Sequence, residues 1–289
     1  MRDRYNIILL LFFLALGARS AAQLTPDKIH GEDIVGHQQP IPYLNARPSD
    51  IVWCTMIWKT IDLNEDFNQY IYFPLDQDDR SGKKSLAYII WEAMERNEIP
   101  IYEDDELKVP IDNQWFIESY TKADTIQLEI GYDEDDNEIY QTVIVPKHFD
   151  GADIYQYYLR EAWFIDKQAN RQESRRMALA PTKDIYITLK TTHEDIYMGH
   201  AALFWVPMQD PSVRNVLARH MAYIDDQNLV AQPSWDYVFV HQYYSAYITR
   251  ESNRYNRSIS HYATGQDAII ESARIEEKVN SIGDDMWEY

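Results

Sequence analysis

Two parts of the chain repeat apolar residues with the period of an amphipathic α-helix. After Ser85 the apolar side chains recur at intervals of three and four, which predicts a helix that ends before Pro100. Near the C-terminus, Thr264 and Asp267 have the spacing of a capped helix start, and Gly283 is expected to stop that helix. The apolar stripe of this C-terminal amphipathic helix consists of Ala268, Ser272, Ile275, Val279 and Ile282.

A third helix is expected from Ser49, a residue type favoured just before a helix, to about Phe67. Cys54 is the only cysteine, so the chain can form no internal disulfide. We interpret Cys54 as a small buried hydrophobic residue rather than a reactive thiol. The expected apolar face of this helix consists of Ile51, Cys54, Trp58 and Ile61.

Other segments have the patterns of β-strands. Alternating apolar and polar residues predict a hairpin over residues 124–146 with a polar turn, and a further half-buried strand over residues 185–190. The apolar run 200–206 predicts a strand buried on both faces, and the aromatic run 237–248 predicts another strand. The fold class expected is α+β, an antiparallel-rich sheet with flanking helices and the C-terminal amphipathic helix.

The N-terminus has the features of a secretory signal peptide. Two arginines precede an apolar run at residues 7–16, and small residues follow it up to Ala22. We therefore expect residues 1–22 to be a signal peptide that is cleaved after Ala22. Residues 23–48 are rich in proline and are interpreted as an extended arm. Residues 49–289 then form the main domain, with a weak division considered near residue 150.

The charge balance excludes several classes of partner. The chain has 27 basic and 47 acidic residues, a formal net charge of −20. Such a chain is unsuited to nucleic acid, which is bound through lysine and arginine, and to an anionic membrane surface. Membrane association is therefore expected only through a partner.

No motif in the sequence identifies catalytic chemistry. There is no G-x-S-x-G motif, and His193-Glu194 begins a zinc motif in which Tyr197 occupies the second histidine position. The acidic segments 76–79 and 133–136 match only part of a calcium-binding loop. We therefore assign no catalytic residue, no metal ion and no cofactor.

Several Trp- and Tyr-rich phrases nevertheless resemble a known family, the gliding-motility protein GldN, called PorN in non-gliding relatives. The resemblance covers roughly residues 48–289. The phrases are Trp53-x4-Trp58-x2-Ile61-Asp62-Leu63-x-Glu65, Arg160-Glu161-Ala162-Trp163-Phe164-Ile165-Asp166-Lys167, Leu203-Phe204-Trp205-Val206, Tyr247-Ile248-x-Arg250-Glu251-Ser252-Asn253-x-Tyr255-x-Arg257-x-Ile259 and Asp285-Met286-Trp287-Glu288-Tyr289.

The resemblance implies a non-enzymatic subunit of the type IX secretion system of Bacteroidota. Members of the family lie in the periplasm, at the inner face of the outer membrane. There they form a ring, from copies of themselves and a GldK/PorK lipoprotein, that the periplasmic part of the GldL–GldM motor (GldM/PorM) is thought to engage. The resemblance carries no active-site residue with it.

A ring subunit needs contact surfaces, and aromatic and arginine residues are the usual anchors of such surfaces. The alternative for the arginines is internal ion pairing that orders the sheet, and most aromatic residues would fill the core. A second hypothesis is a secreted glycan-binding module that uses Trp163 or Trp205, and a third is a hydrolase with an unrecognised carboxylate pair. The candidate interface residues are Arg160, Trp163, Phe164, Tyr243, Tyr247, Arg250, Tyr255 and Arg257.

Overall fold

The computed structural model describes the greater part of the chain after residue 38. The described residues are 39–43, 46–75, 83–122, 124–132, 138–145, 147–169, 171–188, 195–224, 233–255 and 257–285. Residues 39–289 form one compact unit. The predicted signal peptide, most of the predicted arm and the two acidic segments lie outside the described residues, and these interpretations stay predictions, as does a division near residue 150.

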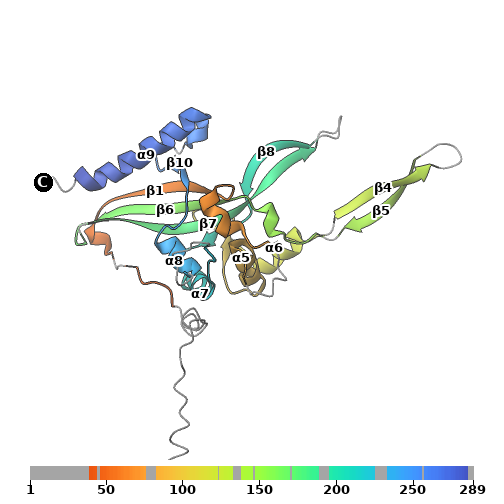
Figure 1. The fold of residues 1–289 in the computed structure, drawn as a ribbon, viewed down its shortest axis with the longest axis horizontal. Helices are drawn as coiled ribbons and strands as arrows, with labels where there is room; N and C mark the ends of the chain where they lie inside the picture. The colour runs from red at the N-terminus through yellow and green to blue at the C-terminus, as the bar shows by residue number, and fades with distance from the viewer. Residues whose placement is uncertain are drawn as a thin grey trace, which may run out of the picture. The chain divides into compact units, whose positions relative to one another are not determined.

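An antiparallel sheet forms the centre of this unit, as Figure 1 shows. Its strand order is β10-β1-β6-β7-β8, and the short strand β9 also pairs with β7. The strands are β1 (Ile51–Asp62), β6 (Gln156–Asp166), β7 (Arg171–Thr188), β8 (Asp195–Ala202), β9 (Val206–Pro207) and β10 (Tyr247–Glu251). Together with the helices around it, this sheet confirms the predicted α+β class.

Two small sheets and a set of helices complete the described structure. The small sheets pair β2 (Ile101–Tyr102) with β3 (Pro110–Ile111), and β4 (Asp124–Tyr132) with β5 (Glu138–Val145). The second pair is the hairpin predicted from the alternation. The helices are η1 (Pro48–Asp50), η2 (Asp66–Asn68), α4 (Gln69–Tyr72), α5 (Leu86–Glu95), α6 (Asn113–Tyr120), η3 (Gly151–Asp153), α7 (Pro211–Arg219), α8 (Trp235–Val240), η4 (Ile259–His261) and α9 (Gln266–Asp285).

The main hydrophobic core joins the sheet to helices α5, α7 and α8. Tyr157 and Leu159 of β6 are fully buried in it, as is Trp235 of α8. The rings of Trp91 and Phe149 stack with their centroids 4.2 Å apart. Helix α5 follows the predicted apolar stripe, with Ser85 as its N-cap residue. Burial of this large aromatic area is the main source of the unit's stability.

A second, smaller core lies under the C-terminal helix. Ile275 and Val279 of α9 are buried against Ile57 of β1 and Ile248 of β10. Figure 1 shows α9 beside these strands. The predicted amphipathic helix is therefore confirmed, although it continues through Gly283 to Asp285.

The helix expected from Ser49 to Phe67 is wrong, because this segment is mainly the strand β1. Ile51, Trp58 and Ile61 fit a helical period by coincidence. The segment is rich in β-branched and aromatic residues, which favour strands, and β1 pairs with a neighbour on each side. The interpretation of Cys54 as buried is also wrong, since its side chain is exposed.

The strand expected over residues 237–248 is also wrong. Ser234 caps helix α8 by accepting a 3.2 Å hydrogen bond from the backbone N–H of Tyr237, and this helix ends at Val240. Gln242 then takes a left-handed conformation with φ of 55°. The chain turns there, and the strand β10 begins only at Tyr247. The cap at Ser234 is the sequence signal that marks this helix.

Two further strand predictions need correction in detail. The apolar run 200–206 is divided between the end of β8 and the start of β9, with Phe204 and Trp205 buried between them. The segment 185–188 is a strand, within β7, but Ile185 and Ile187 are exposed on it rather than half-buried. Local alternation identifies this strand without showing which of its faces the rest of the chain covers.

Stability is expected to fall as the pH rises above about 10. Burial raises the pKa of Tyr157, and burial followed by the nearby Glu161 carboxylate raises the pKa of Tyr244. An unfolded tyrosine has a pKa of about 10, so above that pH the unfolded chain loses protons that the folded chain keeps. The contribution of both tyrosines is therefore complete below about pH 10 and is lost above it.

Urea unfolding across this alkaline range measures the effect. The free energy of unfolding should decrease as the pH rises, and the Tyr157→Phe variant should show a smaller decrease. A folded protein in which every tyrosine ionises near pH 10 would contradict the expectation.

Candidate protein-interaction site

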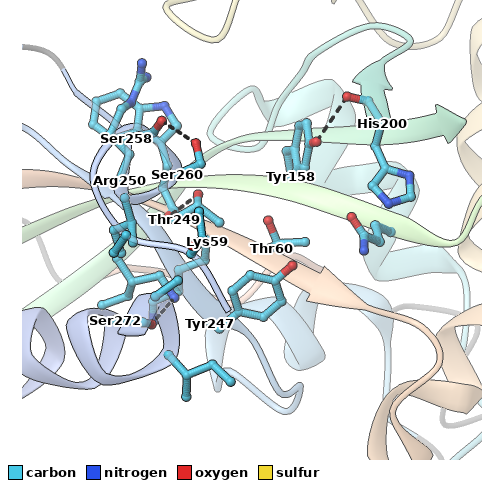
Figure 2. Close-up of a pocket in the computed structure, with 18 of the residues that line it drawn as sticks. Lys59, Thr60, Tyr158, His200, Tyr247, Thr249, Arg250, Ser258, Ser260 and Ser272 are labelled. Carbon is cyan, nitrogen blue, oxygen red and sulfur yellow. Dashed lines mark hydrogen bonds between the residues drawn. The ribbon is translucent and has the colours of Figure 1, made fainter. Parts of the chain in front are cut away.

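A cleft of about 810 Å³ lies over β1 and β10, beside the first turns of α9. Strands β6 and β8 and the short helix η4 also contribute to its walls. Figure 2 shows Ser258 and Ser260 on one side of the cleft and Tyr158 and His200 on the other. The aromatic and hydroxyl groups of the cleft suit contact with another molecule that is partly apolar.

One wall of the cleft is a stacked cluster around Trp58. The guanidinium carbon of Arg250 lies 3.6 Å from the centroid of the Trp58 ring, and that of Arg160 lies 5.6 Å from it. The Trp58 indole N–H donates to Asp105 Oδ2 at 2.5 Å, and Arg250 pairs with the same carboxylate at 2.8 Å. Arg160 donates to the backbone carbonyl of Asp105 at 2.8 Å. For both arginines, these contacts support internal pairing rather than contact with a partner.

Another wall of the cleft is helix α9, which also covers the outer edge of the sheet. The backbone N–H of Ile248 in β10 donates to Ser272 Oγ at 2.9 Å. Lys278 of α9 pairs with Glu251 of β10 at 2.7 Å. An uncovered edge strand is a template for pairing with another chain. Helix α9 therefore prevents strand addition at β10 and directs contacts toward side chains.

The tyrosines of the cleft are neutral hydrogen-bonding groups. Burial is the main cause that raises the pKa of Tyr158 and of Tyr247. Tyr158 donates from its hydroxyl to the carbonyl of His200 at 3.3 Å. Both phenols therefore stay protonated at neutral pH.

An exposed group of side chains adjoins the cleft, where η4 leads into α9. We call Tyr255, Arg257, Tyr262, Ile269 and Ile270 the aromatic–arginine rim. The four uncharged side chains are exposed by 70%, 50%, 71% and 59%, in chain order. The guanidinium carbon of Arg257 lies 5.1 Å from the ring centroid of Tyr255 and 5.9 Å from that of Tyr262. The rim therefore consists of exposed apolar side chains with one arginine held against its two tyrosine rings.

A buried ion pair supports the sheet beneath this region. Lys59 Nζ of β1 lies 3.2 Å from Glu161 Oε2 of β6, and both side chains are buried. Glu161 also accepts hydrogen bonds from the Tyr244 hydroxyl at 3.0 Å and from the Trp163 indole at 2.8 Å. The pair is fully enclosed by the protein's own groups, so its charges are balanced before any partner approaches.

The structure brings some of the predicted interface residues to the cleft and separates others from it. Tyr247 and Arg250 line it, and Arg160 is held in the wall behind Trp58. Tyr255 and Arg257 belong to the rim. The remaining three predicted residues are turned into the protein: Trp163 packs on the second core, Phe164 is buried, and Tyr243 is half-buried beside Phe67.

Sequence reasoning missed several residues of the site. Trp58 was assigned to a helix, and nothing local relates it to Asp105. The sequence alone does indicate Ile269 and Ile270 as surface residues, since both lie outside the apolar stripe of the predicted C-terminal helix. An isoleucine outside the buried stripe of an amphipathic helix indicates a surface that contacts something else.

The described part of the chain contains neither a metal-binding cluster nor a helix able to span a membrane. No group of three or more His, Cys, Asp or Glu side chains there is placed to hold a metal ion. In the same residues, every helix is too short or too polar for a membrane span.

The sequence model of one family, described as Gliding motility associated protein GldN, matches residues 46–288. This chain therefore belongs to the GldN family, and its function is associated with gliding motility. Among proteins of curated function, none matches the chain.

Proposed function

We propose that this protein is a non-enzymatic subunit of a periplasmic ring in the type IX secretion and gliding machinery. It assembles with copies of itself and with a GldK/PorK-type outer-membrane lipoprotein. The ring in turn contacts a GldM/PorM-type periplasmic domain of the GldL–GldM motor. The family match over residues 46–288 is the observation that carries this proposal.

The site supports a role in assembly rather than in turnover. General acids and bases need a side chain that is positioned beside the substrate and has a pKa near the working pH. Around the cleft, Asp105 is paired with Arg250, and Lys59 is paired with Glu161. The exposed part of the site instead offers tyrosine, arginine and isoleucine, of which tyrosine and arginine are typical anchors of protein interfaces.

The proposed location follows from the N-terminal sequence. Residues 1–22 have the features of a secretory signal peptide. After its removal the chain would carry no apolar segment of this kind, and its acidic charge would not hold it on an anionic surface. The lipoprotein partner therefore supplies the attachment to the outer membrane.

Co-purification tests the proposal. The protein and its lipoprotein partner, produced together, should elute as one species of high mass. A protein that elutes as a monomer, apart from the lipoprotein at every salt concentration, would exclude this assembly.

The structure disfavours the tryptophans first considered for a glycan-binding module. Trp205 is only 8% exposed, and the indole N–H of Trp163 is bonded to Glu161. A sugar-binding platform needs a freely exposed aromatic face, whereas Trp205 is buried and Trp163 packs on the second core with Lys59 over its ring. In a glycan pull-down, the Trp163→Ala and Trp205→Ala variants should therefore retain whatever glycan binding the unmodified protein shows.

A further inference from the structure

We propose that the aromatic–arginine rim docks onto an acidic surface of a second copy of this chain, in a head-to-tail contact. The proposal rests on the proposed role in ring assembly, and it assigns one side of the contact between copies. Three properties of the rim carry it: rigidity, exposed apolar area and charge.

The rim is held in shape before any partner binds. Asn253 Oδ1 accepts from the backbone N–H of Tyr255 at 3.0 Å and from that of Arg257 at 3.2 Å. The Asn253 amide donates to the carbonyl of Arg257 at 3.0 Å. The Arg257 side chain itself lies against the rings of Tyr255 and Tyr262. A surface ordered in this way loses less conformational entropy on binding than a mobile one.

The exposed isoleucines have no role inside the chain. Helix α9 uses Ser272, Ile275 and Val279 to cover β10 and the second core. Ile269 and Ile270 lie outside that stripe, and more than half of each side chain is exposed. The Tyr262 hydroxyl donates to Glu271 Oε1 of α9 at 3.1 Å, which places this tyrosine beside the turn that carries Ile269 and Ile270. Exposed apolar groups that gather in this way mark an interaction surface.

Charge selects the partner. Arg257 of the rim and Arg254, three positions before it at the edge of the rim, are exposed, and within the described residues neither has a carboxylate at ion-pair distance. By contrast, Arg250 and Arg274 are each paired with an acidic side chain. The chain as a whole has a net charge of −20, so another copy presents the complementary acidic surface. The same net charge disfavours an anionic membrane as the partner.

The charge also determines the geometry of the contact. Two rims facing each other would bring the arginines of both copies together, and like charges in an interface are unfavourable. The rim must therefore meet a different surface of its neighbour. Contacts of this heterologous kind produce closed rings or open filaments, whereas a two-fold dimer needs the same patch on both sides.

Sedimentation velocity on the purified protein, over a range of protein and salt concentrations, tests the contact. The unmodified protein should self-associate, and association should weaken as salt rises. The double variant Arg254→Glu/Arg257→Glu should associate about tenfold more weakly or worse. The matched control is Arg219→Glu, which reverses a similarly exposed arginine on α7 that pairs with Glu98, and it should associate normally.

A second variant separates charge from apolar area. Ile269→Ser/Ile270→Ser keeps both arginines and should also weaken association, with an unchanged circular dichroism spectrum because neither residue is buried. Equal association of the unmodified protein and both rim variants would overturn the proposal, and so would a monomer under all conditions. A monomer that still co-elutes with the lipoprotein would leave the proposed function standing.

Pelleting with vesicles of phosphatidylcholine and phosphatidylglycerol distinguishes a membrane partner. We expect no binding of the protein to these vesicles. Binding that the Arg254→Glu/Arg257→Glu variant loses, without self-association of the unmodified protein, would assign the rim to a membrane and overturn the contact between copies.

Discussion

Replacing Glu161 with alanine is expected to lower the free energy of unfolding by about 3–5 kcal/mol, because it removes one partner of a buried ion pair. Glu161 is fully buried and forms an ion pair with Lys59. It also accepts hydrogen bonds from the Tyr244 hydroxyl and the Trp163 indole N–H. Without the carboxylate, the Lys59 ammonium remains buried with no anion beside it. The melting temperature should fall by roughly 10 °C in a domain of this size.

A second buried cation lies on the neighbouring strand. Arg176 of β7 lies opposite Glu161 of β6 in the antiparallel register of these strands, and its side chain is buried. It donates to the carbonyl of Ser174, while its Nε and Nη1 atoms have no hydrogen-bond partner in the described structure. Arg176 is therefore a second buried positive charge on the strand beside Glu161.

Two variants control this measurement by thermal and urea unfolding. Glu98→Ala breaks the exposed pair with Arg219 and should cost less than about 1 kcal/mol. The double variant Lys59→Met/Glu161→Leu should recover part of the loss, because it leaves no lysine charge unpaired. A Glu161→Ala protein as stable as Glu98→Ala would show that the buried pair does not stabilise the sheet.

Replacing Ile275 with alanine is expected to release helix α9 far more often than in the unmodified protein. Ile275 is buried in the small second core, and truncating a buried isoleucine costs about 2–5 kcal/mol. Because few other residues hold this helix, the loss should fall on local opening rather than on the whole unit. A cost of about 3 kcal/mol corresponds to roughly a hundredfold more opening.

Limited trypsin digestion reports this opening, because α9 contains Arg274 and Lys278. Cleavage within the helix should become about a hundredfold faster in Ile275→Ala, while the main core unfolds nearly as before. Ile270→Ala is the matched control, since it shortens an exposed isoleucine of the same helix. Equal cleavage rates for the two variants would contradict the assignment of α9 as a helix held by its buried stripe.

Local patterns predicted the elements that depend on local order. Helix α5 and the hairpin of β4 and β5 each have one clear period, and helix α9 has a clear stripe. Strand β1 has no clear period of its own. It pairs with a strand on each side, and its apolar residues fit a helical period as well as a strand. Its identity as a strand depends on partners at least 94 positions away along the chain, which a local pattern does not contain.

The candidate site was predictable only in part for a similar reason. Arg250, Tyr255 and Arg257 were predicted because arginines are basic points in an acidic chain, and because tyrosine and arginine are typical anchors of interfaces. The wall around Trp58 depends on Asp105, which is separated from Trp58 by 47 positions and from Arg250 by 145. Only the folded chain shows that Arg160 and Arg250 are used internally, while Arg257 remains available on the surface.

Protein export by a strain that lacks this chain tests the central claim, that the protein works by assembly within a secretion machine. Cargo with a C-terminal export signal should stay inside the deletion strain, and a restored copy of the gene should return it to the cell surface. Cargo that reaches the surface of the deletion strain at the normal level would contradict the account.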